Sequence, residues 1–256
     1  MYGLEGRRVL ITGGATGIGR KVAIRMAEEG CRVGIFDIDD VQVRQTLDQA
    51  SRFGKEAMFY RADVGDAAAL RDAYDRFRAD LGDVDILINN AAINAIGRIG
   101  ELTLDEWRAV FRVNVEGVFS LCSIVAPIMT ARGSGRIINM ASWFGKIGKA
   151  QYSAYCASKF AVIGLTQSLA AELAPAGVTV NAVCPGTIME TGMREMADKR
   201  SREAGLRTAK ERESEIPLGR VGLPDDVAKV VAFLASGEAC YMTGQAINVT
   251  GGLWMN

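Results

Sequence analysis

Short apolar segments alternate with longer segments of helical periodicity along the whole chain, and this alternation constrains the fold more than any other feature. Several of the apolar segments are almost continuous runs of Val, Ile, Leu and Phe, which is typical of strands covered on both faces. The alternation predicts right-handed β-α-β crossovers and one parallel sheet. The predicted strands are Arg8–Thr12, Arg32–Phe36, Glu56–Tyr60, Val84–Asn89, Arg136–Met140, Val178–Cys184 and Gln245–Val249.

Helix signals fill the intervals between these strands. Thr103 and Glu106 have the spacing of a capping box, and Pro224 suits the first position of a helix. No linker, repeat or low-complexity segment interrupts the alternation. We therefore expect a single α/β domain over residues 1–256, a doubly wound parallel sheet of about seven strands with helices on both faces. The main predicted helices are Trp107–Thr130, Tyr155–Ala174 and Asp225–Ser236.

Composition excludes several kinds of chemistry. The chain has no histidine, which removes Ser-His-Asp hydrolysis, Cys-His proteolysis and His-ligated metal sites. Thirty Lys and Arg balance thirty Asp and Glu, so the net charge gives no reason to expect nucleic acid or an anionic membrane as partner. No uninterrupted apolar stretch reaches the ~20 residues of a membrane span, and no secretory signal is apparent. The five cysteines lack CxxC spacing and are expected to be buried free thiols of a cytoplasmic protein without a metal site.

A glycine-rich segment, Thr12-Gly13-Gly14-Ala15-Thr16-Gly17-Ile18-Gly19, joins the first predicted strand to the helix after it. Glycines allow a sharp turn and a close approach of a pyrophosphate to the backbone. The helix N-terminus adds free N–H groups and a partial positive charge. The strand–turn–helix context favours a dinucleotide site over a purely structural turn. The residues expected at the cofactor here are Gly13, Thr16, Gly17, Ile18 and Gly19.

Asp37, at the end of the second predicted strand, indicates which nicotinamide dinucleotide is bound. A carboxylate there can accept hydrogen bonds from the ribose hydroxyls and would repel a 2′-phosphate. Thr16 is neutral where a basic residue could bind that phosphate, so both residues favour NAD over NADP. A helix-capping role for Asp37 and an Asn-rich structural turn after the fourth strand are the alternatives. Further cofactor contacts are expected from Asp63 and Val64 after the third strand and from Asn90, Ala91 and Ala92 after the fourth.

Tyr155 and Lys159 are candidates for proton transfer. Their spacing of four places them on one face of a predicted helix. An ammonium near a phenol favours the phenolate and lowers a pKa that is ordinarily about 10, which suits general acid/base catalysis. Ser142 follows the fifth predicted strand, at the sheet edge where ligands bind, and can hydrogen-bond a substrate oxygen. Asn114 lies in a long predicted helix, where it is either a satisfied core amide or a functional group.

Together these residues resemble the short-chain dehydrogenase/reductase family over essentially the whole chain. The resemblance implies hydride transfer between a nicotinamide and a secondary alcohol or ketone, without metal or histidine. It also implies that Tyr155 is the acid/base and that Ser142 orients the substrate oxygen. Lys159 would bind the nicotinamide ribose and lower the Tyr155 pKa, and Asn114 would hold a water in a proton relay. The matching motifs are Thr12-Gly13-x-x-x-Gly17-x-Gly19, Asn89-Asn90-Ala91-Ala92, Asn114, Ser142, Tyr155-x-x-x-Lys159 and Pro185-Gly186.

The resemblance extends to cofactor binding and assembly. Pro185, Gly186 and Ile188 are expected to contact NAD, as are Tyr155 and Lys159. A homotetramer is expected, built through the helices near Trp107–Thr130 and Tyr155–Ala174 and through the C-terminal strand. The apolar tail Leu253-Trp254-Met255 would be costly to leave in water, which also suggests a subunit interface.

The C-terminal segment Asn248-Val-Thr-Gly-Gly-Leu-Trp-Met-Asn is similar to the end of bacterial NAD-dependent sorbitol (polyol) dehydrogenases of the family. With Asp37, and with a loop over Gly186–Ile216 longer than in acyl-carrier-protein ketoreductases, it favours a polyol, sugar or related hydroxy compound as substrate. A 3-oxoacyl-(acyl-carrier-protein) or general ketone reductase is the alternative. A non-catalytic nucleotide-sensing regulator is disfavoured because Tyr155 and Lys159 are both present. The expected substrate pocket consists of Asn94, Ser142, Trp143, Phe144, Tyr152, Thr187 and Met193.

The segment Arg194–Glu215 has seven basic and six acidic residues and almost no large apolar ones. It is either a solvated helix or a mobile flap over the cleft. Its position after a strand end favours a flap within residues 187–216, on the substrate side. Its charges are expected to stay in solvent, while apolar side chains at its base face the substrate. Those side chains are Ile188, Met189, Met193 and Met196.

Overall fold

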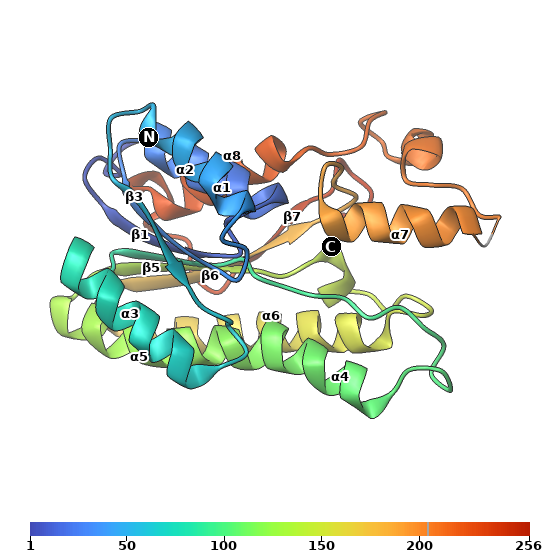
Figure 1. The fold of residues 1–256 in the computed structure, drawn as a ribbon, viewed down its shortest axis with the longest axis horizontal. Helices are drawn as coiled ribbons and strands as arrows, with labels where there is room; N and C mark the ends of the chain where they lie inside the picture. Colours follow the sequence, from blue (N-terminus) through green and yellow to red (C-terminus); the bar gives the residue numbers. More distant parts are fainter. Residues whose placement is uncertain (204) are drawn as a thin grey trace.

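The computed structural model describes residues 1–203 and 205–256, and its centre is a parallel sheet with strand order β3-β2-β1-β4-β5-β6-β7 (Figure 1). Every predicted strand is present, and its ends lie within two residues of the predicted ones. The fold predicted from the alternation is confirmed. The strands are β1 Arg8–Thr12, β2 Arg32–Asp37, β3 Ala57–Arg61, β4 Ile86–Asn89, β5 Gly135–Met140, β6 Val178–Pro185 and β7 Ala246–Val249.

Helices cover both faces of the sheet and create two apolar cores (Figure 1). On β1, Leu10 points to one core while Val9 and Ile11 point to the other. Because successive strand residues face opposite sides, a strand buried on both faces must be apolar throughout. One face carries α1 Gly17–Glu28, α2 Gln42–Ser51 and α8 Pro224–Ala235; the other carries α3 Ala67–Leu81, α4 Leu104–Phe111, α5 Gly117–Arg132 and α6 Ser153–Leu173.

The order of the strands determines where a ligand can bind. The chain moves outward from β1 to β2 and β3, then returns so that β4 pairs with the other side of β1. The crossover helices therefore leave in opposite directions at the carboxyl ends of β1 and β4, which opens a crevice there. The loops after these strands carry the glycine-rich turn and the Asn90–Ala92 segment.

The long helix predicted before β5 is not regular. Its capping box is confirmed, because Thr103 Oγ1 accepts from the Glu106 N–H at 3.2 Å and Glu106 Oε2 accepts from the Thr103 N–H at 2.8 Å. The helix begins at Leu104, three residues before the predicted start, and a π-helical turn over Arg112–Glu116 separates α4 from α5. A π turn inserts one extra residue, and such turns are frequent at functional sites.

The continuous helical stretch Leu104–Arg132 is long and apolar enough to cross a membrane by length and composition, and 44% of its most apolar window is buried inside the fold. A core helix of a globular protein meets the same criteria, and here the stretch covers one face of the sheet (Figure 1). Phe119 on α5 and Phe160 on α6 remain exposed. Exposed aromatic rings on these helices agree with the expected subunit packing, and the tetramer stays a prediction.

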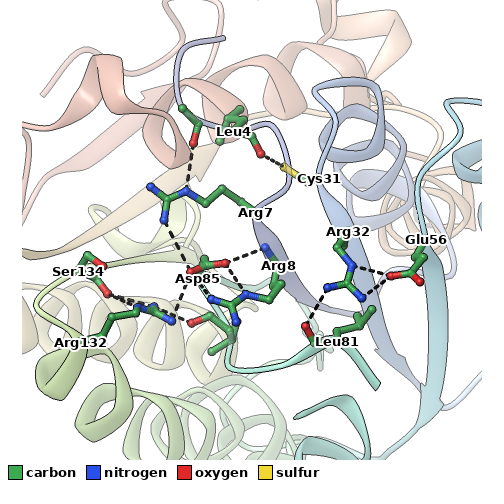
Figure 2. A network of polar contacts seen from close by, with 12 residues as sticks. Leu4, Arg7, Arg8, Cys31, Arg32, Glu56, Leu81, Asp85, Arg132 and Ser134 are labelled. Carbon is green, nitrogen blue, oxygen red and sulfur yellow. Dashed lines mark hydrogen bonds and ion pairs between the residues drawn. The ribbon is translucent and has the colours of Figure 1, made fainter. Parts of the chain in front are cut away.

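A buried ion cluster ties the chain together at the amino-terminal edge of the sheet (Figure 2). Asp85, just before β4, is 6% exposed and accepts from Arg8 Nε at 2.7 Å and Arg8 Nη2 at 2.9 Å. Arg132 Nη1 lies 3.3 Å and Arg7 Nη1 3.6 Å from the same carboxylate. Burial opposes ionisation, but the hydrogen bonds and charge of Arg8 outweigh it and hold the Asp85 pKa below its ordinary value. The cluster joins β1, the start of β4 and the end of α5.

One smaller expectation, that all five cysteines are buried, is corrected. Four cysteines are buried free thiols as expected, but Cys240 is exposed. It lies in a short surface turn after α8 rather than on an apolar face. In the tail, Met255 is exposed, whereas Thr250 Oγ1 donates to the Trp254 carbonyl at 2.9 Å and folds the chain back on itself.

Candidate active site

The glycine-rich turn after β1 is shaped as a cradle. Gly13 and Gly17 have φ angles of +66° and +53°, a region that favours glycine. A Cβ on Gly19 would lie 2.0 Å from the Gly13 carbonyl oxygen, so only glycine fits there. Thr16 is the N-cap of α1, and its hydroxyl makes no capping hydrogen bond to the described residues. The first backbone N–H groups of α1 are therefore available to an anion.

Asn90 holds this turn against the end of β4. Its Nδ2 donates to the carbonyls of Thr12 at 3.0 Å and Gly13 at 2.9 Å. In return, Thr12 Oγ1 accepts from the backbone N–H groups of Asn90 and Ala91, each at 3.0 Å. Asn89 lies elsewhere: it is buried and donates to Asn139 Oδ1 at 2.8 Å. The Asn-rich segment therefore positions the glycine turn as well as facing the cleft.

Asp37 lies beside the glycine turn at the carboxyl end of β2. Its Oδ2 accepts from the Ala15 N–H at 2.8 Å and its Oδ1 from the Asp39 N–H at 3.0 Å. Each carboxylate oxygen keeps a further lone pair for a ligand. Arg20, near the start of α1, donates to the Ala15 carbonyl at 2.6 Å and to Gln45 Oε1 at 2.7 Å. The Arg20 guanidinium is thus hydrogen-bonded to groups of the protein itself.

Ser142, Tyr155 and Lys159 line one cavity, as the sequence predicted. Ser142 follows β5, and its Oγ accepts from the Phe144 N–H at 3.1 Å. Tyr155, in the first turn of α6, is 8% exposed and has Lys159 Nζ 5.6 Å from its ring centroid. Lys159 is buried and donates to the Met140 carbonyl at 2.7 Å. The hydroxyl, phenol and ammonium groups are therefore held on the rigid end of β5 and on one helix.

The protonation equilibria of this group differ from the expectation. Burial raises the pKa of Tyr155 to about 12, although a hydrogen bond with Ser142 lowers it in part. Burial lowers the pKa of Lys159 to about 8. In the protein alone, the Tyr155 pKa is thus raised rather than lowered. The ammonium is directed at the Met140 carbonyl, and the loss of hydration of a buried phenolate outweighs its attraction.

Asn114 lies beneath the cavity rather than on its surface. It is 1% exposed, within the π-helical turn. Its Oδ1 accepts from the Ile93 N–H at 2.8 Å, and its Nδ2 donates to the Ile93 carbonyl at 2.9 Å and to Ser158 Oγ at 3.0 Å. The amide therefore joins the loop after β4 to α6. Its expected role in a proton relay stays a prediction.

All other predicted site residues meet in one cavity of about 590 Å³ at the carboxyl edge of the sheet. Adenosine-side residues such as Asp37 and Asp63 and substrate-side residues such as Asn94 and Met193 line the same space. Sequence reasoning missed a further set, mostly apolar or small residues with no motif of their own. That set is Phe36, Ile38, Ala62, Ile93, Val113, Met140, Ala141, Lys149, Thr191, Gly192, Arg194, Ala197, Ala209, Arg212, Glu215, Ile216 and Leu253.

The segment predicted as a flap forms helix α7 Gly192–Glu203 and a 3-10 helix Lys210–Glu215 beside the cavity. Ile188 and Met193 line the cavity as expected, but Met189 does not line it and Met196 is exposed. On α7, Ala197, which lies four residues after Met193 and on the same helix face, takes the place expected for Met196 in the cavity lining. The expectation that all charges stay in solvent is also wrong, since three charged side chains of this segment line the cavity. Ligand-dependent closure stays a prediction.

Comparisons with known proteins identify the family. A sequence profile described as enoyl-(acyl carrier protein) reductase matches residues 13–254. The chain is 38% identical over 250 residues to a 3-oxoacyl-[acyl-carrier-protein] reductase from Thermotoga maritima, with 98% of each protein covered. The chain belongs to the short-chain dehydrogenase/reductase family. Enzymes of the short-chain dehydrogenase/reductase family use a nicotinamide cofactor and act on hydroxyl or keto groups.

Two solved structures of the family are also similar. The crystal structure of levodione reductase has a TM-score of 0.93 at 31% identity, covering 97% of each chain. The crystal structure of NAD+-bound xylitol dehydrogenase has a TM-score of 0.92 at 30% identity, covering 98% of this chain and all of that one. The specific resemblance to sorbitol dehydrogenases is not confirmed, because the curated relatives include several 3-oxoacyl reductases.

The cavity fits the dinucleotide that short-chain dehydrogenases use. The close approach at Gly13, where a Cβ would lie 2.8 Å from the Ala91 Cα, brings the backbone to the surface that a pyrophosphate needs. The uncapped start of α1 would bind that pyrophosphate, and Asp37 would bind the adenosine ribose. Lys159 and Tyr155 would contact the nicotinamide ribose. An oxidised nicotinamide supplies a positive charge and accepts a hydride.

Proposed function

We propose that this chain is an NAD-dependent dehydrogenase of secondary alcohols, with a polyol, sugar or related hydroxy compound as substrate. The observation that carries the proposal is one cavity with Asp37 at its cofactor end and with Ser142, Tyr155 and Lys159 at its other end. Such a phenol and ammonium pair can perform acid/base chemistry without histidine or metal. The Asp37 carboxylate next to the glycine turn, with a lone pair left on each oxygen for a ligand, supports NAD.

The residues of the chain account for the movement of the proton. In oxidation, Tyr155 as phenolate accepts the proton of the alcohol hydroxyl, while the carbon-bound hydrogen leaves as hydride and the C–O bond becomes a carbonyl. Ser142 Oγ is placed to hydrogen-bond the reacting oxygen and keep it near the phenol. Lys159 favours the phenolate by its charge. In reduction, the Tyr155 phenol returns the proton to the carbonyl oxygen.

A 3-oxoacyl-[acyl-carrier-protein] reductase is the second candidate, and a specific observation favours it. The Thermotoga maritima relative carries that name at 38% identity. Its substrate class would require an open path for a long acyl carrier. The residues of α7 and the 3-10 helix after it instead line the substrate end of the cavity, which favours a small substrate.

Cofactor choice tests the proposal directly. We expect the wild type to form NADH from a panel of secondary alcohols faster than NADPH. Asp37→Ala should lower kcat/KM for NAD by about 10- to 100-fold, because hydrogen bonds to a charged carboxylate are lost, and should raise the relative use of NADP. Asp39→Ala is the matched control, because Asp39 caps α2 through the Val41 and Gln42 N–H groups outside the cavity. A wild-type preference for NADP, or no oxidation of any alcohol, would reject the proposal.

The pH dependence follows from the two buried groups. Oxidation should rise with pH above neutrality because Tyr155 must lose a proton, and reduction should fall because it needs the phenol. Lys159→Met removes a cation 5.6 Å from the ring centroid. At an effective dielectric constant of about 20, that charge contributes on the order of 3 kcal/mol. The midpoint of the oxidation profile should therefore move upward by at most about two pH units, because Lys159 itself loses its charge as the pH rises through its pKa of about 8. Profiles of kcat/KM against pH for both proteins measure the shift, and equal midpoints would contradict it.

A further inference from the structure

The substrate end of the cavity is lined by charged side chains that the proposed hydride transfer does not use. Lys149 comes from the loop between β5 and α6, Arg194 from α7, and Arg212 and Glu215 from the 3-10 helix Lys210–Glu215. Three of these four groups are cations. Whether they represent free positive charge depends on the carboxylates near them.

The carboxylates of the 3-10 helix are already committed to other groups. Each of its three glutamates binds a neighbour within residues 207–215, so none of them faces Arg212 as an ion-pair partner in the described structure. The pairs are Glu211 with Thr208 at 2.8 Å, Glu213 with Lys210 at 2.6 Å, and Glu215 with Arg207.

Arg194 is also neutralised. Its Nη1 lies 3.6 Å from Asp198 Oδ1, and both side chains are largely buried. The same Asp198 oxygen accepts from the Ala209 N–H at 2.9 Å. This bond attaches α7 to the residue just before the 3-10 helix, so the segment that carries Arg212 is held in place by a buried carboxylate.

Arg212 is left without an acidic partner among the residues that the structure describes. Its side chain is half-buried, and its Nε is 3.4 Å from the Thr208 carbonyl. Lys149, at the exposed mouth, likewise has no ion pair there. A guanidinium that is half-buried beside apolar side chains loses hydration without gaining a counter-charge. A ligand anion would restore that counter-charge.

We propose that the substrate carries an anionic group, a carboxylate or a phosphate, which Arg212 binds while Lys149 adds charge at the mouth. The inference rests on the proposed function and narrows its substrate class to hydroxy acids or phosphorylated hydroxy compounds. A guanidinium presents a planar fork of N–H donors that matches both groups bidentately. Because Arg212 lines the same cavity as Tyr155 and Ser142, a substrate whose anionic group binds Arg212 can present its hydroxyl to those two residues.

Related substrates that differ at one position, where an anionic group is present or absent, test the inference. The probes are sorbitol, gluconate and sorbitol 6-phosphate, and also 3-hydroxybutyrate with its methyl ester. We expect kcat/KM for NADH formation to be at least about tenfold higher for an anionic member than for its neutral counterpart. Arg212→Gln should lower the value for the anion by about 10- to 100-fold, mainly through KM, and change that for the neutral compound less than about twofold. A preference for the carboxylate or for the phosphate identifies the source of the charge.

Two further variants separate charge from structure. Lys210→Gln removes a positive charge from the same 3-10 helix but outside the cavity lining. It should leave kcat/KM unchanged for the anionic and for the neutral compounds. Arg212→Lys should restore part of the preference because it keeps the charge and loses the fork. The inference would be overturned if Arg212→Gln lowered kcat/KM equally for charged and neutral compounds. It would also be overturned if the wild type preferred the neutral members.

Calorimetric titration of the same probes distinguishes failure of the inference from failure of the proposed function. If alcohols are oxidised but gluconate and sorbitol 6-phosphate bind no more tightly than sorbitol, the anion site is wrong and the dehydrogenase is retained. If no alcohol is oxidised but the anions bind wild type at least about tenfold more tightly than Arg212→Gln, the anion site is retained and the proposed reaction is wrong.

Discussion

Tyr155→Phe is expected to lower turnover by about 10²- to 10⁴-fold, the range typical of a lost general acid/base. The substitution removes one oxygen and keeps the ring, which packs edge-on against Phe144 with centroids 6.4 Å apart. The hydroxyl that is lost makes a hydrogen bond with Ser142, and such a bond typically contributes only about 1 kcal/mol to stability. The variant should therefore unfold at nearly the wild-type temperature. Steady-state rates with the best alcohol, together with thermal unfolding, measure both effects.

Tyr152→Phe provides the comparison for this prediction. Tyr152 lines the same cavity and packs against Phe144 with centroids 5.2 Å apart. It is the N-cap of α6, however, and precedes Lys159 by seven residues, whereas Tyr155 precedes it by four. Its loss should alter KM more than kcat, because it contacts the substrate without taking its proton. Near-normal kcat in Tyr155→Phe, or an equal loss of kcat in Tyr152→Phe, would show that Tyr155 is not the acid/base.

The sheet could be predicted because its physical requirements are local. A strand buried on both faces must be apolar at successive positions, and the run from Ile86 to Ile88 meets that requirement in sequence alone. The glycine turn could be predicted for a similar reason, since the positive φ of Gly13 is a local property and the contact of Gly19 with the Gly13 carbonyl acts within seven residues of chain. Structural elements that depend on residues close together in the sequence can be predicted from the sequence pattern.

Contacts between segments that are distant in the sequence could not be predicted in this way. The π-helical turn at Asn114 accompanies hydrogen bonds to Ile93 and Ser158, which are 21 and 44 residues away. The buried amide pair Asn89–Asn139 spans 50 residues. Residue spacing predicts which side chains share a helix face, but it does not predict which loop packs against that face. For that reason Asn114 could be selected as important while its partners could not.

The electrostatic properties of the site depended on burial, which spacing does not reveal. Tyr155 and Lys159 were correctly placed on one face of a helix, yet the pKa of Tyr155 is raised because the helix is covered on that face. Arg212 was likewise assigned to a solvated charged segment. Its exposure is set by how α7 and the 3-10 helix dock, through Asp198 and Ala209, and this docking is a tertiary contact.

Asp85→Asn is expected to destabilise the protein by about 3–5 kcal/mol, the usual cost of breaking a buried ion pair from one side. The substitution preserves side-chain volume but leaves the partly buried cations Arg8 and Arg132 without the buried anion that they share (Figure 2). Because folding lowers the Asp85 pKa, the difference in unfolding free energy between wild type and variant should have its largest value at neutral pH. It should shrink as the pH falls below the ordinary aspartate value of about 3.9. Denaturant unfolding at several pH values measures this difference.

Glu56→Gln is the matched control for this stability effect, because Glu56 also binds an arginine at the amino-terminal edge of the sheet, Arg32, at 2.5 Å (Figure 2). Glu56 is 56% exposed by side chain, so solvent screens the pair, and its loss should cost less than about 1 kcal/mol. Asp85 lies at the opposite edge of the sheet from the cavity, so the folded Asp85→Asn variant should keep the wild-type KM. If Asp85→Asn lowered the free energy of unfolding by less than Glu56→Gln does, the ion cluster around Asp85 would not stabilise the fold. Asp85→Asn should lose stability and keep its KM, whereas Tyr155→Phe should lose kcat and keep its stability. Together these results would show that residues at one edge of the sheet stabilise the fold and residues at the other edge carry out the reaction.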